Sequence, residues 1–542
     1  MISYACFIFL SLCLFHNVES SARIDPLVET KVGLIRGLRS GNGQYSMFMG
    51  IPFGQVNASN PFGIATEYPH FEKPYDAYDD TSLCPQTNKT NQFAIGSLDC
   101  LRLNIYVPAV ATSTFKLPVM IWIYGGAFLR GSSSRASAGP DYLVRHDVIL
   151  VTINYRVGPY GFMCLDIPEV PGNQGLKDQY LAIKWVKENI AAFGGDVNKI
   201  TLFGESAGGH SIDLHLRSSN EKLFNNAILQ SGSAVAATVF QEPDKEAPIK
   251  LAEHLGLNTT CIHEALEFLA GTEPEQIIEA TVALDMSFKP CVEKDIDGVD
   301  NFITTTWVDT AVPKVANMPV LLGFNNHEFL TIYANNGVDH YKESNIFQNS
   351  LQSQFKFSED ELVEMSNLFR HFYMGDRPIT EELEWPIVDF GSDYTYIHPI
   401  RRTINKFMES GAGDLYYYMF SYSGGRNYAK IAANITEGGA AHADEMGYLF
   451  SMAALQDAPN AADQLVLDRM TTMWTNFAKY SDPTPEVTDL LPLKWTPVTV
   501  DTLYCMEINS TLTLTGRPLH ERMAFWELFL KMNKALLKKF DD

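Results

Sequence analysis

The stretch Ile200-Thr201-Leu202-Phe203-Gly204-Glu205-Ser206-Ala207-Gly208-Gly209-His210 places a serine between two glycines directly after a short apolar run. The apolar run predicts a buried strand. The pattern Gly-x-Ser-x-Gly after a strand is typical of a sharp turn into a helix, the nucleophile elbow. Glycines are needed there because the crowded backbones leave no room for side chains. The pattern alone arises easily by chance, so its position after the strand is what identifies Ser206 as a candidate nucleophile.

Further apolar runs of the buried-strand type occur at 119–124, 148–153, 227–229, 320–322 and 415–420. Runs that are apolar on both faces suit strands covered by helices on both sides. Between Gly175 and Gly195 the apolar residues recur with a helical period, which predicts a helix ending at the glycine pair. Alternating strands and helices form a mostly parallel sheet. We therefore expect an α/β protein with the α/β-hydrolase fold, its central sheet flanked by helices.

The length of 542 residues alone would suggest several domains. However, no repeat, low-complexity block or Pro/Ser-rich linker divides residues 21–542. The segments at about 235–315 and 335–400 indicate helical insertions, and 523–540 indicates an amphipathic C-terminal helix. The prediction is a single large domain over residues 21–542, with long insertions in its sheet.

Composition excludes several classes of protein. Hydrophobic residues make up 46% of the chain, which is too apolar for a disordered protein. The net charge of −23 argues against nucleic acid or an anionic membrane surface as the main partner, because phosphate binding needs clustered Lys and Arg. Composition therefore excludes a disordered protein, a basic binding protein and a small disulfide scaffold, and it does not by itself indicate a chemistry.

Residues 1–20 have the features of a secretory signal peptide, with an apolar stretch over 4–15 and a suitable cleavage point after Ser20. A signal anchor is the alternative, but the apolar run is short for a bilayer. No later segment has about 18 consecutive apolar residues, so no membrane segment is expected in the mature chain. We expect a secreted, extracellular protein.

Cysteine usage fits an oxidising compartment. Six of the eight cysteines lie beyond the signal peptide. Six cysteines allow 15 pairings, so spacing along the chain is the only guide. It favours disulfides between Cys84 and Cys100 and between Cys261 and Cys291, with Cys164 and Cys505 as free buried thiols. An exported chain could also be N-glycosylated at its N-x-S/T sequons, which lie at Asn57, Asn88, Asn258, Asn434 and Asn509.

An attacking serine needs an oxyanion hole. The apolar run 119–124 leads into Gly125-Gly126, and paired glycines after a strand let backbone N–H groups approach a developing oxyanion. The N–H of Ala207, directly after the serine, would complete the site. Gly125, Gly126 and Ala207 are therefore the candidate oxyanion hole, although an ordinary Gly-Gly turn is the alternative interpretation of the first two.

The serine also needs a base and an acid, which follow it in the order Asp/Glu and then His in this architecture. Among thirteen histidines, His442 lies in a loop of small residues after the run 415–420. Glu328 follows the run 320–322 and is the candidate acid. Asp444 and Glu445 are rivals, but their adjacency to His442 is unfavourable for reaching behind its ring. His210 and His327 are expected to be structural or pocket-lining.

No metal-binding pattern of the type His-Glu-x-x-His and no phosphate-binding loop occurs in the sequence. We therefore expect neither a metal nor a cofactor. The expected partner is a small-molecule ester, and the sequence leaves the oligomeric state undetermined.

The sequence resembles the type-B carboxylesterase family over nearly all of the mature chain. The similarity rests on the elbow and on several other motifs, which include Phe48-Met49-Gly50-Ile51-Pro52-Phe53, Asp99-Cys100-Leu101-Arg102-Leu103-Asn104, Asn154-Tyr155-Arg156-Val157-Gly158-Pro159 and Phe193-Gly194-Gly195-Asp196. Matched position by position, the resemblance implies a catalytic triad of Ser206, Glu328 and His442. It implies an oxyanion hole at Gly125, Gly126 and Ala207.

Within that family the segments around His442 and His520 resemble insect esterases, which include enzymes that degrade pheromone acetates or xenobiotic esters. The resemblance implies hydrolysis of small, mostly neutral carboxylic esters through an acyl-enzyme intermediate. The alternatives are a digestive lipase of the bile-salt-activated kind, a juvenile hormone esterase, and a non-catalytic relative that sequesters ligands. The last is disfavoured because the chain keeps every catalytic part.

Several positions depart from the family pattern. The segment between Cys84 and Cys100 contains no Trp, so a cationic substrate would lack the stacking partner found in acetylcholinesterases. Glu205 precedes the serine where juvenile hormone esterases usually have Gln, and Tyr124 replaces the common His of the oxyanion motif. Phe329 follows the candidate acid where Gly is common. The usual Arg after the Gly-Ile-Pro motif and its Glu partner are both missing.

Overall fold

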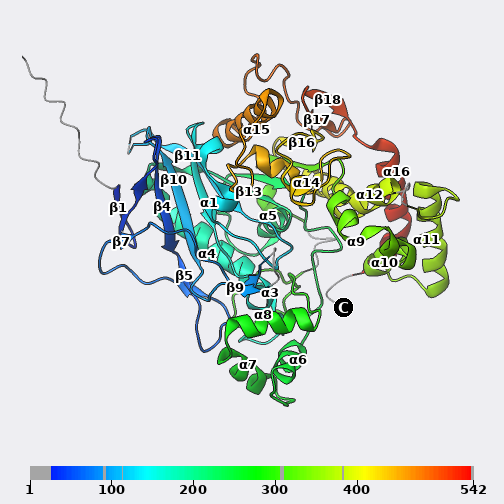
Figure 1. Ribbon diagram of the computed structural model, residues 1–542, viewed down its shortest axis with the longest axis horizontal. Helices are drawn as coiled ribbons and strands as arrows, with labels where there is room; N and C mark the ends of the chain where they lie inside the picture. The colour runs from blue at the N-terminus through cyan, green and yellow to red at the C-terminus, as the bar shows by residue number, and fades with distance from the viewer. Residues whose placement is uncertain (1–25, 89–92, 113, 306–310, 381–383, 539–542) are drawn as a thin grey trace, which may run out of the picture.

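The computed structural model describes residues 26–88, 93–112, 114–305, 311–380 and 384–538 (Figure 1). The predicted signal peptide over residues 1–20 lies outside the described residues. In the described part of the chain no helix is long and apolar enough to cross a membrane.

An eleven-stranded sheet of the described residues forms the centre of the protein, in the order β18-β17-β16-β15-β14-β13-β11-β12-β10-β4-β3. Neighbouring strands from β12 to β17 are parallel, whereas β18, β10, β4 and β3 pair antiparallel. The sheet therefore confirms the predicted mostly parallel α/β fold. From β3 to β18 its strands are Leu38–Arg39, Tyr45–Pro52, Arg102–Pro108, Leu117–Ile123, Ile149–Ile153, Gly195–Glu205, Asn226–Gln230, Val320–Asn325, Leu415–Phe420, Tyr504–Ile508 and Thr513–Gly516.

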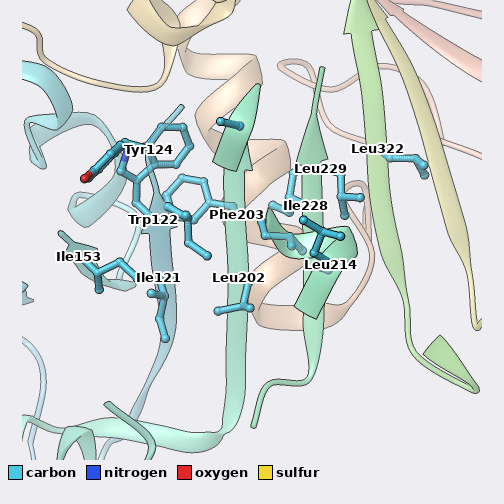
Figure 2. Packing of buried hydrophobic residues seen from close by; sticks show 14 of the residues in the cluster. Ile121, Trp122, Tyr124, Ile153, Leu202, Phe203, Leu214, Ile228, Leu229 and Leu322 are labelled. Carbon is cyan, nitrogen blue, oxygen red and sulfur yellow. The ribbon is translucent and has the colours of Figure 1, made fainter. Parts of the chain in front are cut away.

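The central strands form because both of their faces are apolar and covered. Every residue of β11, β12 and β14 is buried. Trp122 of β11 packs on Phe203 of β13, with ring centroids 4.9 Å apart (Figure 2). Helices α5 (Ala207–Arg217) and α15 (Ala461–Tyr480) pack against these strands. This packing fixes the end of β13, where the candidate nucleophile lies.

The two predicted insertions are helical. In Figure 1 the helices of the first insertion lie together at the bottom of the view, and α9 to α12 of the second lie to the right, beside α16. The first holds α6 (Ala247–His254), α7 (Ile262–Ala270) and α8 (Pro274–Ala283). The second holds α9 (Leu330–Glu343), α10 (Ile346–Gln354), α11 (Glu359–Met374), α12 (Glu384–Ser392) and α13 (His398–Glu409). Apolar residues of both insertions belong to the same buried core as the sheet.

The C-terminal helix α16 spans His520–Asn533 and is followed by a 3-10 turn over Lys534–Leu536. It is shorter than the predicted helix over 523–540. The backbone N–H of Lys356 donates to the carbonyl of Leu536 at 2.7 Å, and Leu537 pairs with Phe355. The chain is extended at this point because it pairs with another segment, which a helical period in the sequence cannot reveal.

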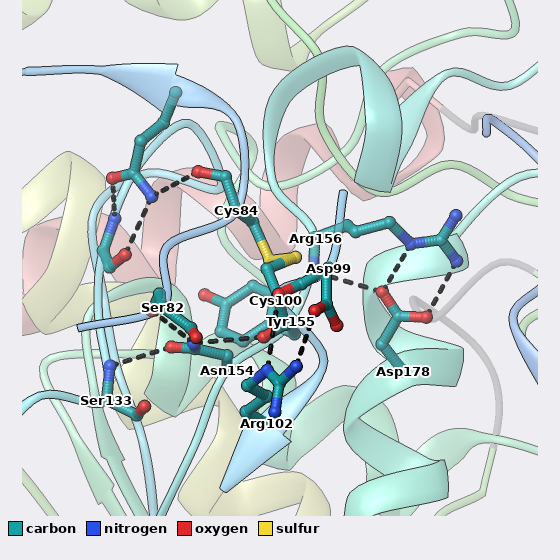
Figure 3. The surroundings of a disulfide bond; sticks show 12 residues. Ser82, Cys84, Asp99, Cys100, Arg102, Ser133, Asn154, Tyr155, Arg156 and Asp178 are labelled. Carbon is teal, nitrogen blue, oxygen red and sulfur yellow. Dashed lines mark hydrogen bonds and ion pairs between the residues drawn. A yellow bond between two sulfur atoms is a disulfide. The ribbon is translucent and has the colours of Figure 1, made fainter. Parts of the chain in front are cut away.

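One of the two predicted disulfides is correct. Cys84 and Cys100 are bonded, next to Asn154, whose side-chain amide donates to the carbonyls of Ser82 and Cys100 (Figure 3). The predicted pair of Cys261 and Cys291 is wrong. Cys291 is buried and bonded to Cys164, which is therefore not the free thiol that we expected.

Cys261 lies exposed at the start of α7 and is free, as is the buried Cys505. The error has a simple physical cause. Cys164 and Cys291 are 127 positions apart in sequence, yet the fold brings their Cα atoms to 6.6 Å. Spacing along the chain favours short loops and carries no information about a contact made by the tertiary fold.

Arg156 contacts the segment that lacks the usual Arg of the family pattern. Its guanidinium is fully buried and makes two hydrogen bonds of 2.8 Å to the Asp178 carboxylate (Figure 3). A further nitrogen of the same group donates to the carbonyls of Pro61 and Gly63. This segment is thus held by Arg156, whose own buried charge is paired with Asp178.

Candidate active site

Ser206 lies on the sharp turn between β13 and α5, as the sequence predicts. Its backbone angles are φ 56° and ψ −123°, which a non-glycine residue rarely adopts. The turn is fixed because Ser206 N–H donates to the carbonyl of Gln230 at 2.9 Å. A Cβ on Gly204 would come within 2.7 Å of the Gly208 backbone, and one on Gly208 would collide with the Ile123 carbonyl. Both glycines of the motif are therefore sterically required.

The glycine pair after β11 lies directly against this serine. A Cβ on Gly125 would be 2.9 Å from the Ser206 Cβ and 2.6 Å from the Glu205 carbonyl. Gly126 has φ 118°, which also favours glycine. Ala207 is the first residue of α5, where backbone N–H groups have no partner within the helix. The structure therefore brings the three candidate oxyanion-hole residues to the nucleophile.

His442 and Glu328 are joined at the same edge of the sheet, because each lies in a loop that follows a parallel strand. His442 Nδ1 is 2.7 Å from Glu328 Oε2. Glu328 is fully buried, and its Oε1 accepts hydrogen bonds from the Ser231 hydroxyl at 2.5 Å and from Asn325 N–H at 2.7 Å. These bonds fix the carboxylate on the Nδ1 side of the imidazole.

In the described part of the chain, the ring of His442 forms ion pairs with Glu205 and Glu328 and with neither rival carboxylate. Asp444 accepts hydrogen bonds from the N–H groups of Ala441 and Lys430. Glu445 accepts them from the Gln230 and Asn325 side chains, and burial, together with the nearby Glu328 carboxylate, raises its pKa to about 7. Both carboxylates bond to segments around the loop of His442, and neither lies behind its ring at Nδ1, where Glu328 is bound.

The two other histidines near the site hold backbone segments. His210 Nδ1 is 2.7 Å from the N–H of Ser233, in the loop after β14. His327 Nδ1 accepts from the N–H of Gly439, three residues before His442. Burial lowers the pKa of each imidazole, so both are neutral near pH 7.

The structure also explains Phe329, the residue after the acid. It has φ −81° and ψ −1°, an ordinary conformation that does not need glycine. Its ring lies against Gly391 of α12, where a Cβ would collide with the ring. Its N–H donates to Ser392 Oγ at 3.0 Å. The Phe329 side chain is accommodated because Gly391 faces it from another helix. The two residues are 62 positions apart in the sequence.

Glu205 is a functional candidate that sequence reasoning missed. Its Oε1 lies 3.1 Å from His442 Nε2 and has no hydrogen-bond partner of good geometry among the described residues. No hydrogen bond joins Ser206 to His442 in the described part of the chain. Burial lowers the pKa of His442, but the carboxylates of Glu205 and Glu328 outweigh burial and raise it above its ordinary value. Burial raises the pKa of Glu205, while the neighbouring His442 cation lowers it, so the carboxylate is favoured when His442 is protonated beside it.

This arrangement predicts the effect of Glu205→Gln on the pH dependence of catalysis. A base must be neutral to accept a proton, so a raised pKa of His442 moves the acid limb of kcat/KM above pH 6.5. Glu205→Gln removes one negative charge beside Nε2, which lowers that pKa and moves the limb to lower pH. The measurement is the pH profile of kcat/KM, with the exposed Glu521→Gln as control. A profile for Glu205→Gln that superimposes on the wild type would contradict this role.

Comparison with known proteins gives a consistent result. The sequence model of the carboxylesterase family matches residues 24–526. Bile salt-activated lipase from Homo sapiens is 31% identical over 530 residues, covering 91% of this chain and 68% of the lipase. Juvenile hormone esterase from Heliothis virescens is 30% identical, covering 84% of this chain and 85% of that one. The solved structure of juvenile hormone esterase from Manduca sexta has a TM-score of 0.82 at 26% identity, covering 94% of this chain and all of that one. These matches confirm the resemblance drawn from the motifs: the chain belongs to the carboxylesterase family, a family of carboxylic ester hydrolases.

Proposed function

We propose that the protein is a secreted serine carboxylesterase that hydrolyses small, mostly neutral esters. One observation carries the proposal. The serine of a sterically required elbow and the half-buried His442, paired with the buried Glu328, lie at the same edge of one mostly parallel sheet. This is the arrangement that nucleophilic ester hydrolysis needs.

In the proposed reaction Ser206 Oγ attacks the ester carbonyl, and His442 Nε2 takes its proton. The oxyanion accepts hydrogen bonds from the N–H groups of Gly125, Gly126 and Ala207. His442 then returns the proton to the leaving alcohol, and Glu328 orients and stabilises the imidazolium. Water, activated by the same histidine, releases the acid from the acyl-enzyme.

The charge of the site supports neutral substrates. Glu205, Glu328 and Glu445 are all buried within reach of His442, where each contributes to its raised pKa. These carboxylates would repel an ester that carries a negative charge near its carbonyl, and the low dielectric of a buried site strengthens that repulsion. The absence of Trp between Cys84 and Cys100 argues against a cationic alcohol group.

Secretion and a single-domain organisation over residues 21–542 are parts of the same proposal. Two disulfides support export, because such bonds persist in oxidising compartments. The core shared by the sheet and both insertions supports one domain. Of the five sequon residues, Asn57, Asn258 and Asn434 are exposed, and Asn88 and Asn509 are half-buried.

The function is tested by labelling with a fluorophosphonate probe, which phosphonylates an activated serine. The protein is recovered from the medium of eukaryotic secretory cells and digested for peptide mapping. We expect one modified residue, Ser206, and a mature N-terminus at Ser21, with heat-denatured protein unlabelled. A folded protein that takes up no probe, or takes it up at another serine, would exclude the proposed mechanism. Retention of residues 1–20 in the recovered protein would contradict cleavage of the signal peptide and would leave the proposed catalytic mechanism unaffected.

A further inference from the structure

The second insertion contains a π-helical turn. Helices α12 and α13 are continuous through Asp393–Ile397, where His398 N–H donates to the carbonyl of Asp393, five positions earlier. The sequence gives the cause, because Pro399 has no N–H for the carbonyl four residues before it and its ring crowds that position. Single π turns inside α-helices are often found at functional sites.

This turn places the ring of Tyr396 on the ring of His442. The two ring centroids are 4.4 Å apart at an interplanar angle of 31°, and Tyr396 is only 7% exposed. Tyr394, in the same turn, packs in another direction, against Phe390 and Trp526. The extra residue of a π turn changes which side chains face the site, and here it directs Tyr396 to the base.

The same segment also contacts the loop of the acid. Ser392 Oγ accepts a hydrogen bond from Phe329 N–H, directly after Glu328, and Gly391 leaves the room that the Phe329 ring fills. Residues 391–396 therefore contact both loops that carry the proposed acid and base. A rigid helical segment of this kind can hold the two side chains at a fixed separation.

The charges that face His442 come from several elements. Glu205 approaches from the end of β13, Glu328 from the loop after β15, and Glu445 from the turn after His442 itself. The neutral His210 faces it from α5. Tyr396 contributes an aromatic face, which carries partial negative charge and attracts a cation. Its effect therefore has the same sign as that of the carboxylates.

We propose that Tyr396 is a positioning residue for the base: its ring fixes the plane of the His442 imidazole and stabilises the imidazolium that forms when Ser206 gives up its proton. The inference rests on the proposed serine mechanism. The ring alone performs this role, so phenylalanine can replace tyrosine, whereas an aliphatic side chain cannot.

The test compares Tyr396→Phe, Tyr396→Leu and Tyr396→Met on a short aryl acetate. For the two aliphatic variants we expect kcat to fall about tenfold, which is less than the roughly hundredfold loss when a catalytic group is misplaced by about 1 Å. We expect KM to change less than about threefold. Their acid limb of kcat/KM should move to lower pH, because loss of the aromatic face favours the neutral imidazole. Tyr396→Phe should keep the wild-type kcat and the wild-type limb.

Tyr394→Leu is the matched control, since it removes a tyrosine of the same turn that does not touch His442. It should lower the unfolding temperature without moving the acid limb. Two aliphatic variants are used so that one that fails to fold can be replaced by the other, with folding checked by circular dichroism.

Two outcomes would overturn the proposal for Tyr396. One is a wild-type kcat and acid limb in folded Tyr396→Leu or Tyr396→Met. The other is a Tyr396→Phe variant as impaired as the aliphatic ones, because the hydroxyl and not the ring would then be responsible. Failure of the serine mechanism is distinguishable, since the wild-type protein would then not take up the fluorophosphonate.

Discussion

Ser206→Ala should reduce kcat/KM for a short aryl acetate by at least about 10⁴-fold, the scale of loss when a serine hydrolase loses its nucleophile. The Ser206 hydroxyl forms the only covalent bond in the proposed first step, and alanine offers no atom that could replace it. The remaining activity would come from binding and from the oxyanion hole. Initial rates of ester hydrolysis at saturating and limiting substrate measure the effect.

The variant should fold normally. Ser206 already has a positive φ, so alanine adds no strain beyond that of the serine, and the N–H that bonds Gln230 is kept. Ser218→Ala is the matched control, because it removes a buried serine hydroxyl at the far end of α5. It should keep wild-type activity. If Ser206→Ala retained more than a tenth of the wild-type rate, the nucleophile would have been assigned wrongly.

Of the two disulfides, the bond between Cys164 and Cys291 should contribute more to the free energy of unfolding. Closing a loop of about 100 residues contributes about 4.7 kcal/mol in the chain-entropy model, and this loop spans 127 positions. The bonded region also holds the buried ion pair of Lys177 and Glu293, at 2.8 Å. We expect Cys164→Ala/Cys291→Ala to lose about 5 kcal/mol in guanidinium unfolding, and Cys84→Ala/Cys100→Ala about 3 kcal/mol.

Two further cysteines provide the controls for that comparison. Cys261→Ala should leave the unfolding midpoint unchanged, because Cys261 is exposed and unpaired. In the native protein a thiol reagent should modify Cys261 rapidly and the buried Cys505 only after unfolding. A non-reduced digest that links Cys261 to Cys291 would show that the pairing expected from spacing was correct after all.

The sequence predicts the fold and the reacting groups well because the signals for them are local. The elbow needs two glycines within five residues, and the buried strands are continuous apolar runs, so both can be identified without knowing any contact. The positions of Glu328 and His442 follow from strand order, since each lies in the loop after a parallel strand. The triad and oxyanion assignments stay predictions until the variants are measured.

The features that could not be predicted depend on contacts between distant segments. Cys291 bonds Cys164 because the first insertion folds back on the sheet. Glu205 approaches His442 only when β13 and the loop after β16 meet at one edge. The room for Phe329 is provided by Gly391, and the direction of Tyr396 is set by Pro399. The first three of these contacts join residues far apart in the chain. The last depends on a π-helical turn, which a hydropathy pattern does not reveal.

The two outermost strands of the sheet have a consequence for behaviour in concentrated solution. β3 spans only two residues and β18 four, so each outer edge exposes few unpaired backbone N–H and C=O groups. Long open edges are templates on which other chains add strands and aggregate, and short ones are not. Repulsion between molecules of net charge −23 acts in the same direction. A wide parallel sheet can therefore remain dispersed at high protein concentration.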